Sequence, residues 1–188
     1  MIKSASRSSI TNDQKYRSML AGTVPSSEYL IETALVSTAT PSVTFSNLAQ
    51  YAGIYKHLQI VTVAKSTQAG TGSDGVSALI ELNGSGLTAH YLYGDGSQVY
   101  TGFVTTHGFV LNLVRSGVAN AFSASVTDIL DAYSSSKNKT VKSIGGYNSE
   151  LALASALWQN TAPISSVTIK TTADSFAVGS RFSLYGVV

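Results

Sequence analysis

The histidines and one close pair of aspartates are the residues most able to support chemistry, and neither pattern is complete. His57, His90 and His107 stand in separate segments, without the spacing of a metal site. Asp128 and Asp131 form the one close carboxylate pair in an apolar run, but a separation of three on a strand places them on opposite faces. We therefore expect no catalytic residue, no cofactor and no metal. A calcium ion held by one aspartate with turn carbonyls is the alternative.

The glycines from Gly70 to Gly75 have the G-x-G-x-x-G spacing of a dinucleotide-binding turn, and they follow a predicted strand. A pyrophosphate also needs the N-terminus of a helix at this point. The following segment, VSALIELNG at 76–84, instead has the length of a short strand and ends in a glycine-rich turn. The segment is predicted to be a flexible hairpin loop.

Tyrosines surround the turn Gly94-Asp95-Gly96, and they are the most suggestive binding residues in the chain. Tyrosine gives a large contact area at low entropic cost, so this region could stack on a sugar or on a protein partner. The alternative is that these are half-buried sheet tyrosines with hydroxyls at the rim. For a glycan site, we expect the contacts to come from His90, Tyr91, Tyr93 and Asp95.

The composition indicates a protein that works by association. The 188 residues suit one domain, and the absence of cysteine excludes disulfides and thiol chemistry. Charged residues make up 12% of the chain, against about 25% in a typical soluble domain. A weakly charged surface lacks one defence against association, which suits a surface covered by copies of itself or by a partner. We therefore expect a homo-oligomer.

The N-terminal region is basic and is predicted to be an arm. Four cations against Asp13 give residues 1–17 a net charge of +3, and QKYRSML could form a short helix that ends at Gly22. Residues 1–27 are therefore predicted to be an attachment arm and linker. Cations without interleaved aromatic residues make nucleic acid an unfavoured partner. The expected contact residues are Lys3, Arg7, Lys15, Tyr16, Arg17, Met19 and Leu20.

From residue 28 onward the sequence predicts an antiparallel β-sandwich, jelly-roll-like, that extends to residue 188. Short β-branched and aromatic runs alternate with Gly, Ser, Asn and Asp clusters, and no convincing helical period appears. At least ten strands are expected, with two of the runs broken or irregular. The runs are 28–36, 41–46, 54–65, 76–84, 89–94, 98–104, 108–114, 121–130, 139–146, 151–158, 166–172 and 181–188.

Several side chains are expected to face the core of this sandwich. Phe182, Leu184 and Gly186 share one face of the last predicted strand, and Val167 and Ile169 share a face of the strand before it. Trp158 is predicted to be a core residue because of its size. The run LALASALW, at 151–158, is rich in helix formers, so a short helix is the alternative there.

Seven segments resemble a recurrent family of small proteins encoded in the structural modules of tailed phages. They are KYRSMLAGT, YLIETALV, YKHLQIV, HYLYGDGS, DILDAYSSSKNKTVKSIGGY, LWQNTAPISSVTI and FAVGSRFSLYGV, and they span nearly the whole chain. The most specific parts are YKHLQI, DILDAYSSSKNKTV and FSLYGV. The resemblance implies a virion component, either a capsid decoration protein or a head or tail fibre. Because phage surface proteins of this kind often occupy three-fold positions, the resemblance also makes a trimer the preferred homo-oligomer. It implies no catalytic residue.

The function predicted from these observations is structural and non-enzymatic. We expect a component of the virion surface, made in the host cytoplasm and attached to other virion proteins through the N-terminal arm. No stretch reaches the roughly 20 apolar residues that a membrane span needs. The alternative is a carbohydrate-binding module of a tail fibre that recognises a host glycan. A glycan-cleaving enzyme is disfavoured because no suitable carboxylate pair is evident.

Overall fold

The computed structural model describes residues 27–71, 76–147 and 150–188, and it is built almost entirely from strands. Strand bounds are β1 Glu28–Leu35, β2 Ser42–Phe45, β3 His57–Ala64, β4 Ser77–Leu82, β5 Thr88–Gly94, β6 Val99–Val104, β7 Gly108–Asn112, β8 Ser123–Leu130, β9 Lys139–Tyr147, β10 Glu150–Trp158, β11 Val167–Thr171 and β12 Arg181–Val187. One short 3-10 helix, η1, spans Leu48–Tyr51.

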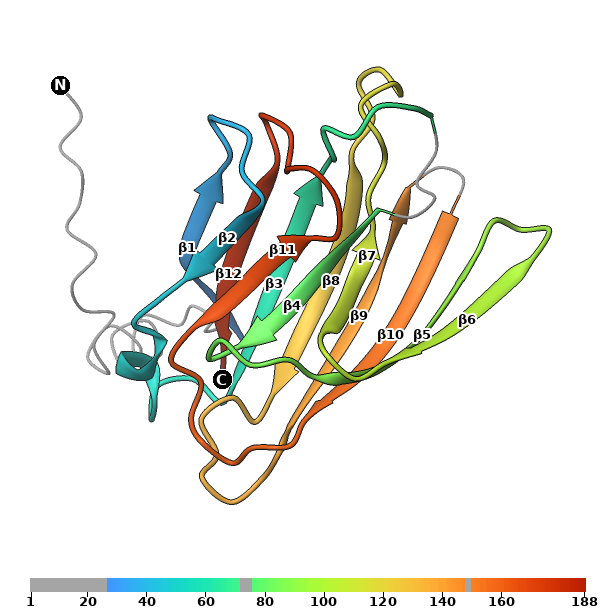
Figure 1. The fold of residues 1–188 in the computed structure, drawn as a ribbon. Coiled ribbons are helices and arrows are strands. Elements are labelled where there is room, and N and C mark those ends of the chain that lie inside the picture. The colour runs from blue at the N-terminus through green and yellow to red at the C-terminus, as the bar shows by residue number, and fades with distance from the viewer. Residues whose placement is uncertain (1–26, 72–75, 148–149) are drawn as a thin grey trace, which may run out of the picture.

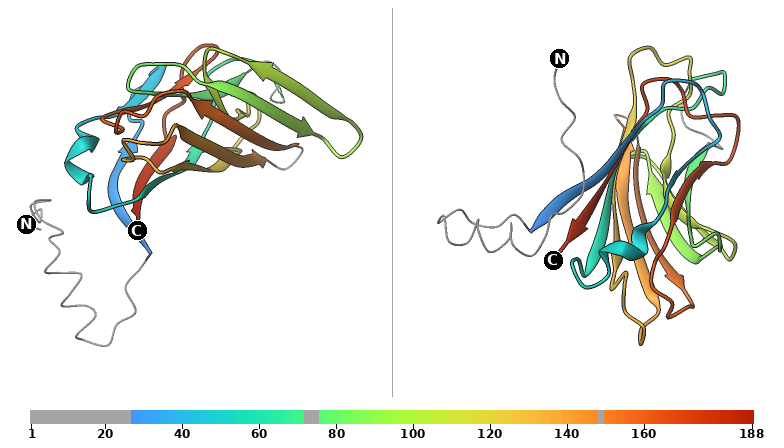
Figure 2. Two further views of the ribbon diagram at one scale, coloured as in Figure 1. Left: turned by 90° about the horizontal axis from the view of Figure 1, so that it is seen from below. Right: turned by 90° about the vertical axis from the view of Figure 1, so that its left-hand side faces the viewer.

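The strands form two antiparallel sheets that pack face to face (Figures 1 and 2). An eight-stranded sheet has the order β1-β12-β3-β8-β9-β10-β5-β6, and a four-stranded sheet has the order β2-β11-β4-β7. The smaller sheet covers only part of the larger one, and the β5–β6 hairpin extends past it at one end (Figure 1). We call the side of the eight-stranded sheet that meets the smaller sheet the inner face, and the opposite side the outer face.

The core lies between the sheets and follows from strand alternation. From the larger sheet it takes Leu58, Ile60 and Phe182, and from the smaller sheet it takes Val167 and Ile169, all of them fully buried. The predicted faces of the last two strands are therefore confirmed. Trp158 is 4% exposed, which confirms it as a core residue.

The last strand is an interior strand of the larger sheet, next to the edge strand β1. β12 lies between β1 and β3, and Leu184 pairs with Ile60 on one side and with Glu32 on the other. Gly186 is needed here, because a Cβ at this position would come within 2.2 Å of the Tyr55 ring. The C-terminal strand is thus enclosed by its neighbours and forms no edge.

The sequence-based expectations hold at the level of the two sheets. Each of the twelve predicted runs contains or overlaps a strand, and the doubtful run at 151–158 lies in β10 and forms no helix. The prediction of a hairpin loop after Gly70 is wrong, because β3 and β4 belong to different sheets and the segment crosses between them. Residues 72–75 themselves lie outside the described residues. The jelly-roll likeness, the arm and its short helix stay predictions.

Candidate interaction surface

Strand β10 has its leucines on the outer face and alanines on the inner face, and its one large inner side chain is Trp158 at the end of the strand. Leu151, Leu153 and Leu157 point outward and are 55%, 40% and 37% exposed. Ala152 and Ala156, which alternate with them, are buried on the inner face. A sheet that is solvated on one side normally alternates in the opposite sense, with apolar residues inside and polar residues outside. The sequence of β10 therefore suits a strand with neighbours on both faces.

Strands β8 and β9 repeat this inversion at the centre of the sheet. Ser125, Thr127 and Ser143 are buried on the inner face. Val126 and Ile144 lie on the outer face and are 36% and 51% exposed. At the centre of the sheet, hydroxyl side chains are thus enclosed and branched aliphatic side chains are left accessible to water.

The pairing register joins the outward aliphatic residues into one continuous row. Val61 pairs with Val126, Val126 with Ile144, and Ile144 with Leu153. Leu153 then pairs with Leu92, and Leu92 with Thr101 in β6. Directly opposed residues of neighbouring strands point to the same face. The row crosses five strands, and we call it the aliphatic ladder: Val61, Val126, Ile144, Leu153 and Leu92.

The close approach of β7 explains why the inner residues are small. The Ser143 hydroxyl donates a 2.6 Å hydrogen bond to the Val110 carbonyl oxygen of β7, and it also contacts the Thr127 hydroxyl at 2.9 Å. A side chain of the larger sheet thus bonds directly to the backbone of the smaller one. These bonds satisfy the hydroxyls of Ser143 and Thr127, whereas the buried Ser125 hydroxyl has no hydrogen-bond partner among the described residues. The close approach of β7 accounts for the small side chains of the inner face. It does not account for the aliphatic ladder outside.

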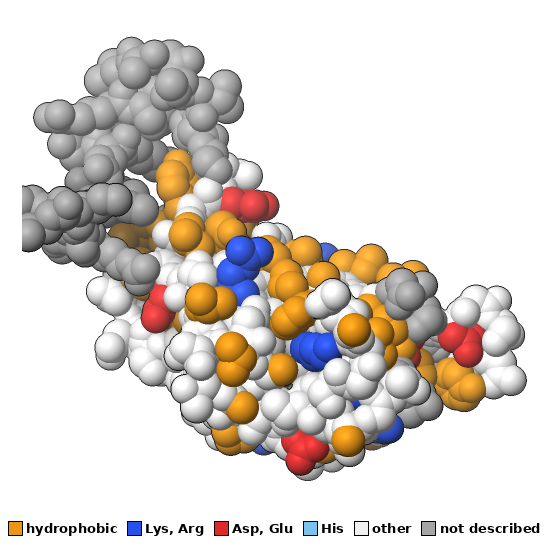
Figure 3. All heavy atoms as spheres, turned by 90° about the horizontal axis from the view of Figure 1, so that it is seen from above, with side chains coloured by type: hydrophobic (Ala, Val, Ile, Leu, Met, Phe, Trp, Pro, Cys, Tyr) orange, Lys and Arg blue, Asp and Glu red, His pale blue; other side chains and the backbone are white. Residues whose placement is uncertain are grey.

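Charges on the outer face are few, and those beside the ladder are balanced. Asp128 and Lys142 are cross-strand partners in β8 and β9, and Gln59 donates a 2.9 Å hydrogen bond to the Asp128 carboxylate. Figure 3 shows a different side of the molecule, viewed from the top of Figure 1, where hydrophobic and uncharged side chains also prevail. The weak charge predicted from composition is therefore visible on the folded surface.

A shallow hollow of about 640 Å³ lies at the β6 end of the sheet, where the ladder residues Leu92 and Leu153 form part of its lining. The rings of His90 and Phe103 meet across β5 and β6 with centroids 4.6 Å apart. Phe103 remains 55% exposed and Leu92 is 41% exposed. The hollow extends the apolar character of the outer face as far as the edge strand.

The tyrosines predicted as binding residues form a stack on the inner side of the β5–β6 hairpin. Tyr91 stacks on Phe109 with centroids 4.7 Å apart, and Tyr93 follows it at 6.4 Å. Tyr93 stacks in turn on Tyr100 at 5.0 Å, and Tyr100 is 43% exposed. The stack therefore runs from the sandwich outward along the hairpin, with Tyr100 as its accessible end.

The turn between β5 and β6 is ordered by the carboxylate of Asp95. Its Oδ1 accepts hydrogen bonds from the hydroxyl of Ser97 at 2.7 Å and from the backbone N–H groups of Gln98 and Ser97 at 2.8 and 2.9 Å. These bonds lower the pKa of Asp95 from 3.8 to about 2, the Ser97 hydroxyl contributing most. Gly96 takes a φ of 87°, which favours glycine.

The four residues predicted as glycan contacts are not brought to one place. Tyr91 and Tyr93 lie on the inner side of the hairpin, whereas His90 alternates to the outer face and packs on Phe103. Asp95 is engaged by its own turn. Sequence reasoning grouped them by proximity along the chain, although strand alternation separates neighbours. The alternation of LALASALW was the readable signal for the outer face, and it was missed.

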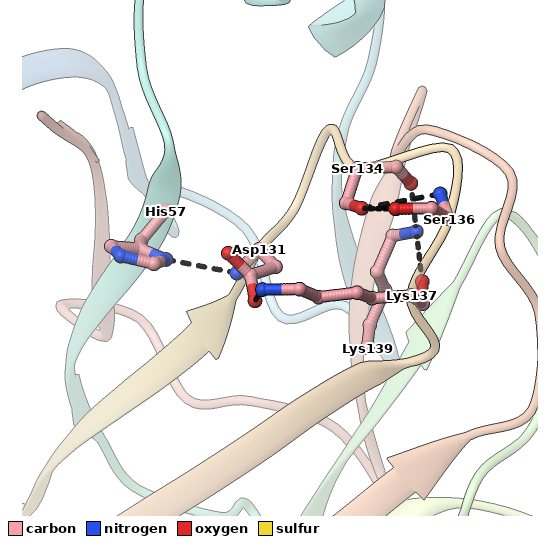
Figure 4. Close-up of polar contacts among 6 residues, drawn as sticks. All are labelled: His57, Asp131, Ser134, Ser136, Lys137 and Lys139. Atoms are coloured by element: carbon pink, nitrogen blue, oxygen red, sulfur yellow. Dashed lines mark hydrogen bonds and ion pairs between the residues drawn. The ribbon is translucent and has the colours of Figure 1, made fainter.

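The close-up in Figure 4 shows where His57 and Asp131 lie. The backbone N–H of Asp131 donates to His57 Nδ1 at 2.8 Å, and the Asp131 carboxylate pairs with Lys137 at 3.0 Å. Asp131 has a φ of 51° at the end of β8 and belongs to a corner of the fold. Its partnership with Lys137 lowers its pKa. His57 and Asp131 thus fix a turn.

Lys139 anchors the same corner from inside the protein. The side chain is fully buried, and its ammonium donates to the carbonyl oxygens of Ser134, Lys137 and Thr161 at 2.6, 2.9 and 2.9 Å. Burial lowers the pKa of Lys139. Three carbonyls around one ammonium join the β8–β9 loop to the segment that follows β10.

The most specific segments of the phage resemblance lie side by side in this region. FSLYGV belongs to β12, YKHLQI leads into β3, and DILDAYSSSKNKTV runs from β8 into β9, and these strands are consecutive in the sheet. The contact of Gly186 with Tyr55 and the bond between Asp131 and His57 join them pairwise. Their residues are therefore accounted for by the architecture of the corner.

Neither a metal site nor a membrane-spanning helix is found in the described parts of the chain. No group of three or more His, Asp or Glu side chains there could hold a metal ion, and no helix there is long and apolar enough to cross a membrane. The predicted arm contacts, from Lys3 to Leu20, lie outside the described residues. No protein-family model, curated protein or solved structure matches the chain.

Proposed function

We propose that this protein is a structural component of the surface of a tailed bacteriophage virion, of the capsid decoration or fibre type, and that it works by assembly and without catalysis. The proposal includes a homo-oligomer, a trimer being preferred, with a jelly-roll-like sandwich held on the particle by residues 1–27. The resemblance of the three corner segments to phage structural proteins supports the phage context.

The single observation that carries the assembly role is the inverted alternation of strands β8, β9 and β10 in the eight-stranded sheet. Each half-exposed branched side chain of the ladder leaves apolar surface in contact with water. Covering that surface with a partner would contribute about 25 cal/mol of favourable free energy per Å² buried. Contiguous exposed apolar patches mark interaction sites in soluble proteins. The occupant proposed for the outer face is a neighbouring virion protein.

The size of the outer face fits such a contact. Eight strands about 4.8 Å apart, each about eight residues long, give a face of about 35 by 25 Å, or about 900 Å². A standard protein interface buries about 800 Å² on each partner. The opposite charges of the cross-strand partners Asp128 and Lys142 cancel, so this pair adds no net charge to the outer face.

The test is binding to phage particles that lack the protein, measured by co-sedimentation and by copy number from quantitative mass spectrometry. The wild-type chain is expected to bind in many copies. Leu153→Lys, which places a charge in the ladder, should abolish binding and leave circular dichroism unchanged. The matched control is Gln50→Lys, at an exposed position of η1. Failure of the wild-type chain to bind any particle would refute the virion role.

A carbohydrate-binding module of a tail fibre is the second candidate, favoured by the accessible end of the tyrosine stack. Tyr93 and Tyr100 offer stacked rings at the open end of the hairpin, which could contact a sugar face. On this reading Tyr93→Ala and Tyr100→Ala each remove binding to host polysaccharide, measured by calorimetry. Binding that survives both substitutions, or no binding by the wild-type protein, would exclude a sugar site there.

A further inference from the structure

The two sheets of the described chain end in four edge strands, which differ in how they are protected. An unprotected edge presents unpaired N–H and C=O groups and can pair with another chain. β1 carries Glu28 and Glu32 and has a register shift beside Glu32. β2 has only four residues and follows Pro41, and all five residues of β7 are buried. Charges, a bulge, shortness, proline and coverage are the usual protections.

Strand β6 has none of these protections within the described structure. Its sequence, VYTGFV, contains no charged residue and no proline, and it forms the free border of the larger sheet in Figure 1. Val99 is 71% exposed, Phe103 55% and Tyr100 43%. The neighbouring strand β5 pairs with it along the whole strand, from Ala89–Val104 to Gly94–Val99, without a register shift, so no bulge interrupts this edge.

We propose that β6 pairs antiparallel with β6 of a second copy of this chain, about a two-fold axis that passes beside Thr101. The axis is perpendicular to the sheet, so the outer faces of the two copies lie on the same side of the joined sheet. Residues that are directly opposed across the new strand pair must therefore point to the same face. Pairing about Thr101 meets this condition, with Thr101 opposite Thr101, and with Val99 opposite Phe103 on both sides. Aromatic with β-branched pairs and Thr with Thr pairs are favourable across antiparallel strands.

The same register continues the aliphatic ladder from one copy to the next. Leu92 pairs with Thr101 inside each copy, so the row would run from one Leu92 through two threonines to the other Leu92. Charge does not oppose the contact. Asp95, in the β5–β6 turn, lies at opposite ends of the two antiparallel strands and does not face its own copy. A second copy is therefore the occupant whose sequence and geometry match this edge.

This contact does not depend on the proposed virion role, since two copies could pair without any particle. It is also separate from the three-fold contact of a trimer, which would need another surface because a two-fold axis relates only two copies.

Disulfide trapping tests the proposal cleanly because the chain has no cysteine of its own. Directly opposed Cα atoms lie about 4.5–5.5 Å apart in an antiparallel pair, within the disulfide range of about 4.4–6.8 Å. In the full chain, Thr101→Cys should give a covalent dimer as its main product under mild oxidation. The control is Thr44→Cys, another exposed threonine, on the short β2 edge, and this variant should stay monomeric.

The register has its own test. A mixture of Val99→Cys and Phe103→Cys proteins should give a mixed dimer, and neither variant alone should match it. Thr101→Lys should lower the dimer fraction in sedimentation equilibrium, whereas Thr44→Lys should not. The proposal is overturned if Thr101→Cys gives no more dimer than Thr44→Cys. If Val99→Cys protein alone forms as much covalent dimer as the mixture does, the proposed register is wrong. The two-fold axis would then not pass beside Thr101.

Discussion

The inner and outer faces of the eight-stranded sheet differ in the size and polarity of the side chains that they carry. At its centre the inner face carries Ser125, Thr127 and Ser143 against the closely packed β7, whereas the outer face carries Val126 and Ile144 in water. The small inner side chains thus mark the place where β7 packs closely against the larger sheet. On the proposed assembly role, the larger residues mark the face that a neighbouring protein covers.

The strongest way to sharpen this comparison is to remove the largest inner side chain of β10. Trp158→Ala should lower the free energy of unfolding by about 3–5 kcal/mol, because a buried ring leaves a cavity that the sandwich cannot fill. The measurement is urea denaturation followed by circular dichroism. A loss well below 1 kcal/mol would place Trp158 outside the core that the two sheets share.

Strand β9 offers a matched pair of lysines, one on each face. Lys139→Met should cost about 2 kcal/mol, because three buried carbonyl oxygens lose their donor. Lys142→Met, on the exposed outer face three residues further along, should change stability by less than about 0.5 kcal/mol. Thermal denaturation of both variants checks the contrast, and equal effects would contradict it.

Acid should loosen the β5–β6 turn while both faces of the sheet stay intact. The folded pKa of Asp95 lies below its usual value, so the ionised carboxylate stabilises the turn above about pH 4. That contribution is lost as the pH falls toward 2, where the carboxylate takes up a proton. The amide signals of Ser97 and Gln98 should titrate with a midpoint near 2, and Asp95→Asn should abolish this titration. A midpoint at or above 3.8 would refute the turn geometry.

The smallest expected effect is on the outer face of the isolated protein. Leu153→Thr keeps a strand-forming residue and removes a half-exposed side chain, so stability should fall by less than about 1 kcal/mol. Chemical denaturation of the isolated chain measures this loss. A loss as large as that of Trp158→Ala would mean that the outer face is already packed in the free chain.

The sequence predicted most of the secondary structure because short apolar runs between turn residues carry strong local signals. The predicted run at 181–188 lies in β12, with its two faces assigned correctly. The doubt over 151–158 arose because leucine and alanine favour helices locally, and pairing with β9 and β5 decided in favour of a strand. Which strands share a sheet could not be derived, because β12 pairs with β1 and β3 across most of the chain length.

The candidate site was less predictable, since it depends on long-range register. The alternation of leucine with smaller residues in β10 is visible in the sequence. Which of the two sets faces the smaller sheet depends on where β7 packs, and the sequence of β10 does not specify this. The aliphatic ladder joins Val61 to Leu92 through three intervening strands, and no local pattern encodes that order. The tyrosines near the β5–β6 turn lie together in one stack, whereas His90 lies on the opposite face of β5, a separation that follows from strand alternation.

Solvent access at one outer-face position tests the central claim most directly. Ser155 lies on the outer face of β10, exposed and next to the ladder, and the chain has no other thiol to confuse labelling. Ser155→Cys protein should react rapidly with a maleimide when free and slowly when assembled on phage particles. Thr44→Cys, on the smaller sheet, should react alike in both states. Equal labelling of Ser155→Cys in the free and the assembled protein would contradict a covered outer face.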